Sequence, residues 1–230
     1  MTLCIGCREQ GKLFFAADSR ISFPDNHPFD GAIKIASVRM EVDMINPHTL
    51  SDEELFYGNI ALCFSGSTVN AFALKEELSD SLTSLLAPTY SFETIARRAF
   101  DKYVDVSKKL CFALAGDKGQ AAVMFSGFCV ESRRERAFLF KPSLKTANEY
   151  EFSNILETDG QYEFLGSGAK AGKRLLGATS QPVTTSLLIE VLEAVIEDDK
   201  VDSVGGNVRV GGFDKYHSFT SAWLSRSKRR

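Results

Sequence analysis

The stretch TLCIGCREQGKLFFAADSR, residues 2–20, decides the fold that this sequence predicts. Two short apolar runs flank a polar turn at Glu9-Gln10-Gly11, a pattern typical of a β-hairpin. We therefore predict that Thr2–Cys7 and Lys12–Ala17 pair as antiparallel strands. The chain then begins as a strand, with a threonine directly behind the initiator methionine.

The other strand-like runs occur in groups, with helical segments between them. Four segments are predicted as helices, three of them with apolar residues on one face: Val69–Leu86, Phe92–Leu110, Ala169–Leu176 and Thr184–Glu197. Strand-like runs lie at 31–36, 59–65, 121–130, 137–141, 162–165 and 208–210, and a long loop or a short inserted helix is expected over Val42–Tyr57. Grouped strands argue against a doubly wound parallel sheet and favour a two-sheet sandwich covered by helices. We expect residues 1–230 to form a single α+β domain.

The composition excludes several classes of protein. The 230 residues carry a net charge of −3, which argues against a dedicated nucleic-acid binder despite the basic SRSKRR at 225–230. No apolar run has the length of a membrane span, and the sequence shows no secretory signal pattern. The five cysteines are odd in number and lie mostly in apolar runs, so we expect reduced, buried thiols in a cytoplasmic protein. The three histidines are scattered, and we expect neither a metal nor another cofactor.

Cys4 and Cys7 form a C-x-x-C pattern. A redox motif of this kind would lie at a helix start just after a strand, and a zinc site would need a second pair, and the sequence offers neither. Their odd spacing on a strand places the two side chains on opposite faces. We therefore expect two cysteines packed in the core.

Removal of Met1 is easy when the next side chain is small. It would give Thr2 a free α-amino group in addition to its hydroxyl. The new α-amino group lies beside the threonine hydroxyl and can act as its base, because a hydroxyl alone is a weak nucleophile. The reference pKa of such an amine, about 7.7–8, suits a general base near neutral pH. Taken alone, Thr2 is better explained as merely the second residue of the chain.

Two charged residues are expected close to Thr2. Antiparallel pairing returns Asp18 to the level of Thr2. Lys34 lies between isoleucines in AIKIA, so it should be buried with a carboxylate, and Asp18 is the natural partner. A fixed ammonium there would disfavour protonation of the amine and stabilise an alkoxide. In the alternative interpretation, Asp18 and Arg20 cap a turn and Lys34 extends its amine to solvent.

An ordered set of segments resembles the proteasome β-subunit family, which includes bacterial ring-shaped peptidases paired with AAA+ unfoldases. The set comprises Thr2, AADSR at Ala16–Arg20, Lys34 in I-K-I, FSGS at Phe64–Ser67, GSG at Gly166–Gly168 and DSVGG at Asp202–Gly206. It extends over most of the chain, and its first, second and third members have the mutual spacing of the family's catalytic threonine, aspartate and lysine. The resemblance implies a four-layer αββα sandwich, the N-terminal nucleophile hydrolase fold.

The resemblance also implies a catalytic set: Thr2, Asp18, Lys34, Gly66, Ser167 and Asp202. The threonine would attack the scissile carbonyl, with its own amine as proton shuttle through a water. Asp18 and Lys34 would set the electrostatics, and the backbone N–H of Gly66 would stabilise the oxyanion. Ser167 and Asp202 would orient the terminus.

The implied substrate-binding set is Ile21, Ser22, Ala32, Ala36, Phe64 and Thr68. Ser22 and Gly66 would pair with the substrate backbone as an added strand. The other five members of the set would line the S1 pocket. An apolar lining without a charged residue predicts cleavage after hydrophobic side chains.

The function that follows is an N-terminal threonine endopeptidase, a subunit of a self-compartmentalising ring protease that acts on peptides or unfolded proteins. A homo-oligomeric ring is expected, and an AAA+ unfoldase is left open as a further partner. Two alternatives remain: a catalytically silent structural ring subunit, and an N-terminal nucleophile amidohydrolase for a small amide. The assembly state separates the ring protease from the amidohydrolase.

Two segments depart from the family pattern. DSVGG is one residue shorter than D-x-x-S-G-G, so the serine position falls on Gly205 when counted forward and on Val204 when counted back. The segment Val38–Tyr57 is longer than the corresponding connection in typical β-subunits. It could cap the substrate channel, mediate ring contacts or be a surface loop.

Overall fold

The computed structural model describes residues 2–23, 26–45, 52–83, 85–87, 91–114, 116–146 and 148–225. Its strands are β1 (Cys4–Glu9), β2 (Lys12–Ala17), β3 (Ile21–Phe23), β4 (Asn26–Phe29), β5 (Ile35–Ile45), β6 (Asp52–Gly66), β7 (Leu85–Ala87), β8 (Ala121–Cys129), β9 (Arg134–Pro142), β10 (Tyr150–Ile155), β11 (Tyr162–Leu165), β12 (Arg209–Phe213) and β13 (Phe219–Trp223). Its α-helices are α1 (Thr68–Ser81), α2 (Phe92–Ala113), α3 (Ala169–Gly177) and α4 (Thr185–Ile196). One sheet has the order β11-β1-β2-β12-β13 and the other β10-β9-β8-β6-β5-β7, while β3 and β4 pair separately.

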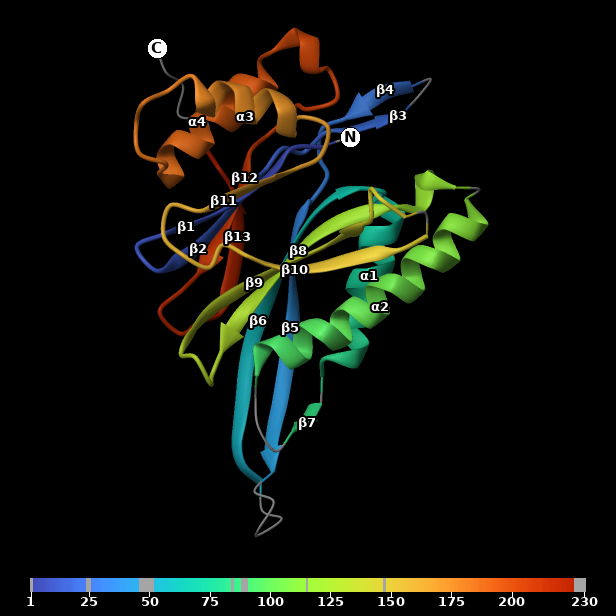
Figure 1. The fold of residues 1–230 in the computed structure, drawn as a ribbon, viewed down its shortest axis with the longest axis vertical. Coiled ribbons are helices and arrows are strands. Elements are labelled where there is room, and N and C mark those ends of the chain that lie inside the picture. Colours follow the sequence, from blue (N-terminus) through green and yellow to red (C-terminus); the bar gives the residue numbers. More distant parts are fainter. Residues whose placement is uncertain are drawn as a thin grey trace.

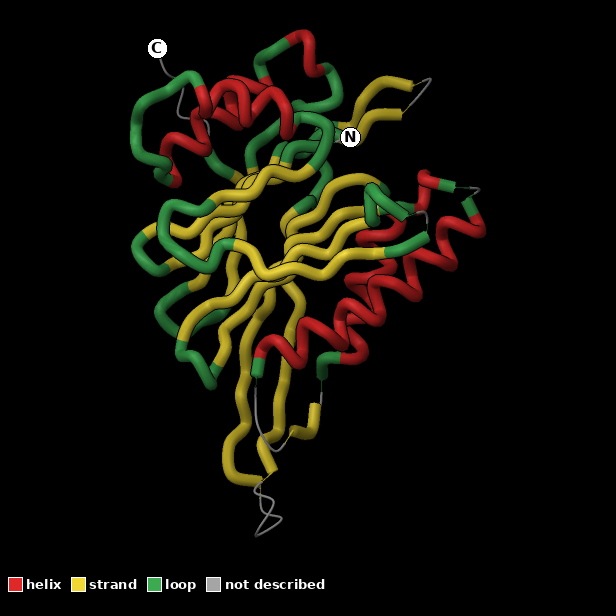
Figure 2. Tube along the Cα trace, viewed as in Figure 1, coloured by secondary structure: helices red, strands yellow, loops and turns green. Residues whose placement is uncertain are grey.

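The helices cover the outer faces of the two larger sheets, which gives four layers (Figures 1 and 2). Helices α1 and α2 pack on the six-stranded sheet around Leu74 and Phe92. Helices α3 and α4 pack on the five-stranded sheet around Leu188. The sheets face one another across a further core that includes Phe15 and Met124. The predicted αββα sandwich of the α+β class is therefore confirmed.

The N-terminal hairpin forms as predicted, with β1 antiparallel to β2. Gln10 and Gly11 make its turn with φ of 50° and 75°, the left-handed backbone that suits the twist of a two-residue hairpin. Cys4 lies in the core between the sheets, whereas Cys7 lies in the core under α3 and α4. The opposite orientations expected from their odd spacing are confirmed.

The prediction of a loop or an inserted helix over Val42–Tyr57 is wrong. β5 and β6 run through most of this segment as one antiparallel ribbon, which extends from Ile35 opposite Cys63 to Ile45 opposite Asp52. The remaining positions, 46–51, lie outside the described residues. Acidic residues in the paired parts lower the local strand preference, and pairing between the two strands overrides it. The far part of the ribbon extends beyond the helices (Figure 1).

Three further differences concern element boundaries. The helix predicted to reach Leu86 ends at Ser81, and β7 follows it, parallel to β5. The strand predicted at 31–36 begins at Ile35, so Lys34 precedes it. β10 has no counterpart in the sequence prediction, because it is an edge strand without regular alternation of buried and exposed residues.

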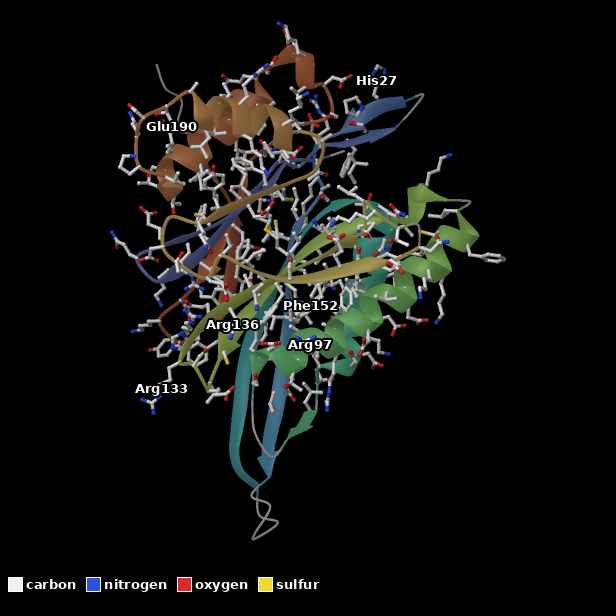
Figure 3. The ribbon with its side chains drawn as sticks, viewed as in Figure 1. His27, Arg97, Arg133, Arg136, Phe152 and Glu190 are labelled. Carbon is white, nitrogen blue, oxygen red and sulfur yellow. The ribbon has the colours of Figure 1, made fainter. Side chains whose placement is uncertain are left out.

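Helix α2 is held on its sheet by aromatic side chains. Phe92 stacks on Phe125 with 5.3 Å between ring centroids. Farther along the helix, the guanidinium of Arg97 lies 4.8 Å from the ring centroid of Phe152 on β10 (Figure 3). Such stacked and cation–π contacts add to the burial of apolar area.

The described part of the chain has neither a membrane-spanning helix nor a cluster of metal-binding side chains. None of its helices is both long enough and apolar enough to cross a membrane. The same residues contain no group of three or more His, Cys, Asp or Glu side chains arranged to hold a metal ion.

Candidate active site

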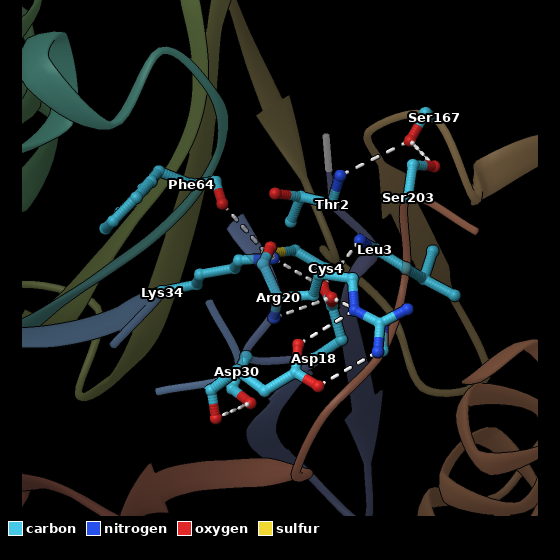
Figure 4. A network of polar contacts seen from close by, with 12 residues as sticks. Thr2, Leu3, Cys4, Asp18, Arg20, Asp30, Lys34, Phe64, Ser167 and Ser203 are labelled. Carbon is cyan, nitrogen blue, oxygen red and sulfur yellow. Dashed lines mark hydrogen bonds and ion pairs between the residues drawn. The ribbon is translucent and has the colours of Figure 1, made fainter. Parts of the chain in front are cut away.

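Segments that are far apart in the sequence meet in one network of polar contacts (Figure 4). Thr2 lies just before β1, Asp18 just after β2, Lys34 just before β5, and Ser167 between β11 and α3. Short loops at the ends of a rigid sheet hold side chains in a defined geometry. The strand register sets Asp18 opposite Leu3, one residue from the predicted level with Thr2, because its N–H donates to the Leu3 carbonyl at 3.2 Å.

Lys34 and Asp18 form a buried ion pair. Nζ lies 2.8 Å from Oδ1, and the two side chains are 2% and 0% exposed, so the predicted pairing is confirmed. The carboxylate also accepts from the N–H groups of Leu3 at 2.9 Å, Arg20 at 3.1 Å and Gly205 at 3.0 Å. Lys34 Nζ also donates to the Arg20 carbonyl at 2.5 Å. Buried charges need such partners, and these bonds fix both groups in place.

The backbone nitrogen of Thr2 becomes the amine when Met1 is removed. It contacts one hydroxyl, which in turn contacts a second one. It donates to Ser167 Oγ at 3.3 Å, and Ser167 Oγ lies 2.9 Å from Ser203 Oγ. Asp202, the predicted partner, is exposed, and its carbonyl oxygen accepts from Arg20 at 3.0 Å. Ser203 is thus the residue that motif counting misses, because DSVGG lacks one residue of the D-x-x-S-G-G pattern.

Two glycines allow close approach around Thr2. Gly166 has a φ of 97°, and a Cβ there would overlap the Thr2 carbonyl oxygen. Gly66 has a φ of 94°, and its Cβ would lie 2.7 Å from the Gln120 carbonyl oxygen. Both positions therefore require glycine for backbone geometry. Gly168 completes the contact by donating its N–H to the Thr2 carbonyl at 3.3 Å.

We expect Gly166→Ala to lower the free energy of unfolding by about 2 kcal/mol or more, since alanine is strained at positive φ and its Cβ would displace Thr2. Urea denaturation measures this loss. Gly160→Ala is the matched control, because Gly160 has a φ of 83° and open space around the added Cβ. Equal losses in the two variants would show that the contact with Thr2 adds no strain.

The six predicted substrate-binding residues come from several elements, namely β3, β5, β6, α1 and, for Ala32, the segment before β5. Ile21 and Ser22 are half-buried in β3, and Thr68 opens α1. Ala32 is buried, while Ala36 and Phe64 are part of the core under α1 and α2. The Phe64 ring meets Phe72 of α1 edge-on, with centroids 5.9 Å apart.

A cavity of about 230 Å³ touches Thr2. Its walls are Thr2, Ser65, Gly66, Gln120, Ala121, Ala122, Pro142, Gly166 and Ser167. The cavity therefore brings together three members of the predicted catalytic set and none of the predicted substrate-binding set. Side chains alternate along β6, which sends Phe64 toward the helices and Ser65 toward this cavity.

Arg20 and Asp30 form a second, partly exposed ion pair next to the site. Arg20 Nε and Nη2 donate to the two carboxylate oxygens at 2.8 and 2.9 Å. Hydrogen bonds from this guanidinium lower the pKa of the Asp30 carboxyl, and the same bonds raise the pKa of Arg20. The pair is therefore charged at neutral pH.

The lowered pKa of Asp30 makes its contribution to stability dependent on pH. A carboxyl whose pKa is lower in the folded state stabilises above its unfolded pKa of 3.8, and the effect is lost as pH falls through the folded pKa. We expect Asp30→Asn to lower the melting temperature slightly at pH 7, because the pair is partly exposed. This difference should shrink below pH 3.8 in calorimetric scans. A difference that grows on acidification would contradict the assignment.

The four layers define the fold class as an αββα sandwich, with Thr2 just before the first strand. Among solved structures, the chain is similar to a Gly-1 mutant of Anbu from Hyphomicrobium sp. strain MC1, with a TM-score of 0.66, 16% identity and coverage of 100% of this chain and 89% of that one. It is also similar to Anbu from Pseudomonas aeruginosa, described as a helical assembly of the Anbu complex, with a TM-score of 0.64, 14% identity and coverage of 99% and 88%.

A second Anbu structure from the Hyphomicrobium strain gives a TM-score of 0.63 with 16% identity, over 99% of this chain and 89% of that one. No protein-family model and no curated protein matches the sequence. At such low identity the structural likeness shows the fold alone.

Proposed function

We propose that this chain is an N-terminal threonine endopeptidase, active after removal of Met1, and a subunit of a self-compartmentalising assembly. The observation that carries the proposal is the environment of Thr2. Its nitrogen donates to Ser167 at 3.3 Å, and its neighbour Leu3 donates to the same Asp18 carboxylate that binds the buried Lys34. A buried lysine and aspartate beside a threonine at the start of a strand suit a hydroxyl nucleophile.

In the proposed reaction, the Thr2 hydroxyl attacks the scissile carbonyl while the free amine takes the hydroxyl proton, through a water. The Lys34 ammonium stabilises the developing negative charge on the hydroxyl oxygen, and Asp18 holds that ammonium in place. The Gly66 N–H stabilises the oxyanion. Collapse forms an ester on Thr2 and passes the proton to the leaving amine, and water then hydrolyses the ester.

Ser167 and Ser203 orient the amine in this scheme, and Ser203 takes the role that motif counting gives to Asp202. On the substrate side, Ser22 and Gly66 pair with the peptide backbone. Ile21, Ala32, Ala36, Phe64 and Thr68 are the proposed S1 wall, which is distinct from the cavity that touches Thr2. Their apolar character supports cleavage after hydrophobic residues.

The proposed assembly is a homo-oligomeric ring that encloses the site. The physical argument is that an open threonine peptidase would cleave other proteins around it. The structural likeness to Anbu, one of whose structures is described as a helical assembly, supports self-association of this chain. An AAA+ unfoldase as partner is supported by the family resemblance of the sequence alone.

The test is the intact mass of the purified protein before and after treatment with an epoxyketone or a β-lactone, together with its native mass. We expect loss of Met1, a single adduct on Thr2 and a mass of many subunits. A free Thr2 that takes no adduct within a large assembly would indicate a structural subunit. An adduct on a monomer that hydrolyses only small amides would indicate an amidohydrolase.

A further inference from the structure

Arg20 contacts both the buried Lys34–Asp18 pair and the loop that carries Ser203, and the proposed mechanism gives it no role. Its backbone N–H donates to Asp18 Oδ2, and its carbonyl oxygen accepts from Lys34 Nζ. Its guanidinium instead contacts Asp30 and the loop that carries Ser203 (Figure 4). One residue therefore joins the buried ion pair to the loop that orients the Thr2 nitrogen.

Three hydrogen bonds fix the guanidinium. Nε and Nη2 donate to the two oxygens of Asp30 at 2.8 and 2.9 Å, and Nη1 donates to the Asp202 carbonyl at 3.0 Å. A planar guanidinium matches a carboxylate with two parallel bonds and still has a donor left, which a lysine ammonium does not reproduce. Gly205 leaves room for this arrangement, because a Cβ there would overlap the guanidinium.

The carbonyl that Arg20 holds belongs to the peptide bond between Asp202 and Ser203. Ser203 Oγ lies 2.9 Å from Ser167 Oγ, which accepts from the Thr2 nitrogen at 3.3 Å. The guanidinium is thus connected to the Thr2 nitrogen through the Asp202–Ser203 peptide bond and the hydroxyls of Ser203 and Ser167. The far end of the same loop is held independently, since Gly205 N–H donates to Asp18.

We propose that the Arg20–Asp30 pair is a positioning clasp for the Thr2 nitrogen. By holding the Asp202–Ser203 peptide, the pair places Ser203, and through it Ser167. The catalytic consequence rests on the proposed function, whereas the clasp itself is a property of the loop geometry. The two side chains are 24% and 40% exposed, so the pair contributes little to global stability. Its effect on Thr2 should therefore exceed its effect on the melting temperature.

The experiment measures the reactivity of the Thr2 amine in full-length protein prepared with Thr2 as its first residue. Acetic anhydride acylates the amine, and mass spectrometry of the N-terminal peptide gives the labelling rate across pH. The Thr2 nitrogen is held by Ser167, so its release from that hydroxyl increases access of the reagent. We expect Arg20→Lys to raise the labelling rate about fivefold, the effect of one lost hydrogen bond.

A double-mutant cycle shows whether Arg20 acts through Ser203. Ser203→Ala should raise the labelling rate as much as Arg20→Lys, and the double variant should exceed neither. The matched control is Glu93→Gln, which removes partly exposed ion pairs with Arg97 and Arg136 and should leave the rate unchanged. In addition, Arg20→Lys should react about tenfold more slowly with an epoxyketone, because a displaced amine transfers protons poorly.

The outcomes test the clasp and the peptidase function separately. An unchanged labelling rate in Arg20→Lys, or additive effects of Arg20→Lys and Ser203→Ala, would overturn the clasp. A wild-type protein that takes no epoxyketone adduct would overturn the peptidase function. The labelling series would still decide the clasp in that case, because acylation of an amine requires no catalysis by the protein.

Discussion

Thr2→Ala is expected to abolish peptide hydrolysis and adduct formation, with a loss of roughly 10⁴-fold or more in kcat/KM. Alanine keeps the backbone nitrogen that donates to Ser167 and removes the hydroxyl together with one methyl group. The free energy of unfolding should therefore stay within about 1 kcal/mol of the wild type. Hydrolysis of a fluorogenic peptide and urea denaturation provide the two measurements.

Thr2→Ser is the matched control for this prediction. Serine keeps both the hydroxyl and the amine, so a substantial part of the activity should remain. Full activity in Thr2→Ala would place the nucleophile elsewhere and exclude the proposed mechanism. Equal inactivity of both variants would require a separate role for the threonine methyl group.

Replacing Lys34 with methionine should remove activity and also destabilise the fold by about 3–5 kcal/mol. Methionine fills a similar volume, but the Asp18 carboxylate, which is 0% exposed, loses its only ion-pair partner among the described residues. Activity falls because the ammonium that stabilises the developing charge is lost. Chemical denaturation measures the loss of stability, and adduct formation measures the loss of activity.

Lys109→Met serves as the control for the loss of charge. Lys109 pairs with Asp105 on the surface of α2, and both side chains are more than half exposed, at 74% and 56%. An exposed pair contributes little, so we expect a change near zero. A Lys34→Met protein as stable as Lys109→Met would show that the Asp18 charge is compensated without the lysine.

Local patterns were sufficient to predict the layers of the fold. The turn at Gln10-Gly11 and the grouping of strands and helices depend on neighbouring residues, and the structure has these elements. The ribbon of β5 and β6 was not predictable in the same way. Its strand character comes from pairing between Ile45 and Asp52 and their neighbours, which overrides local composition.

The site likewise has one part that local sequence predicts and one part that it does not. The Lys34–Asp18 pair follows from elementary chemistry, because a lysine between isoleucines needs a carboxylate and the hairpin returns one. The contact of Ser203 with Ser167 and the hydrogen bond from Arg20 to the Asp202 carbonyl depend on the path of the loop that carries Asp202 and Ser203. No local pattern in DSVGG indicates which residue of that loop meets Ser167.

The bonds around Thr2 and Asp18 also determine when the site is completed during biosynthesis. Ser167 lies 165 residues after Thr2, and Gly205 lies 187 residues after Asp18. A ribosome therefore releases the N-terminal hairpin long before it makes the residues that contact Thr2 and Asp18. Since domains assemble as their residues emerge, the nascent chain carries an unfinished site until translation is nearly complete. Sequence separation alone would thus delay the proposed chemistry at Thr2 until the last strands of the sandwich are available.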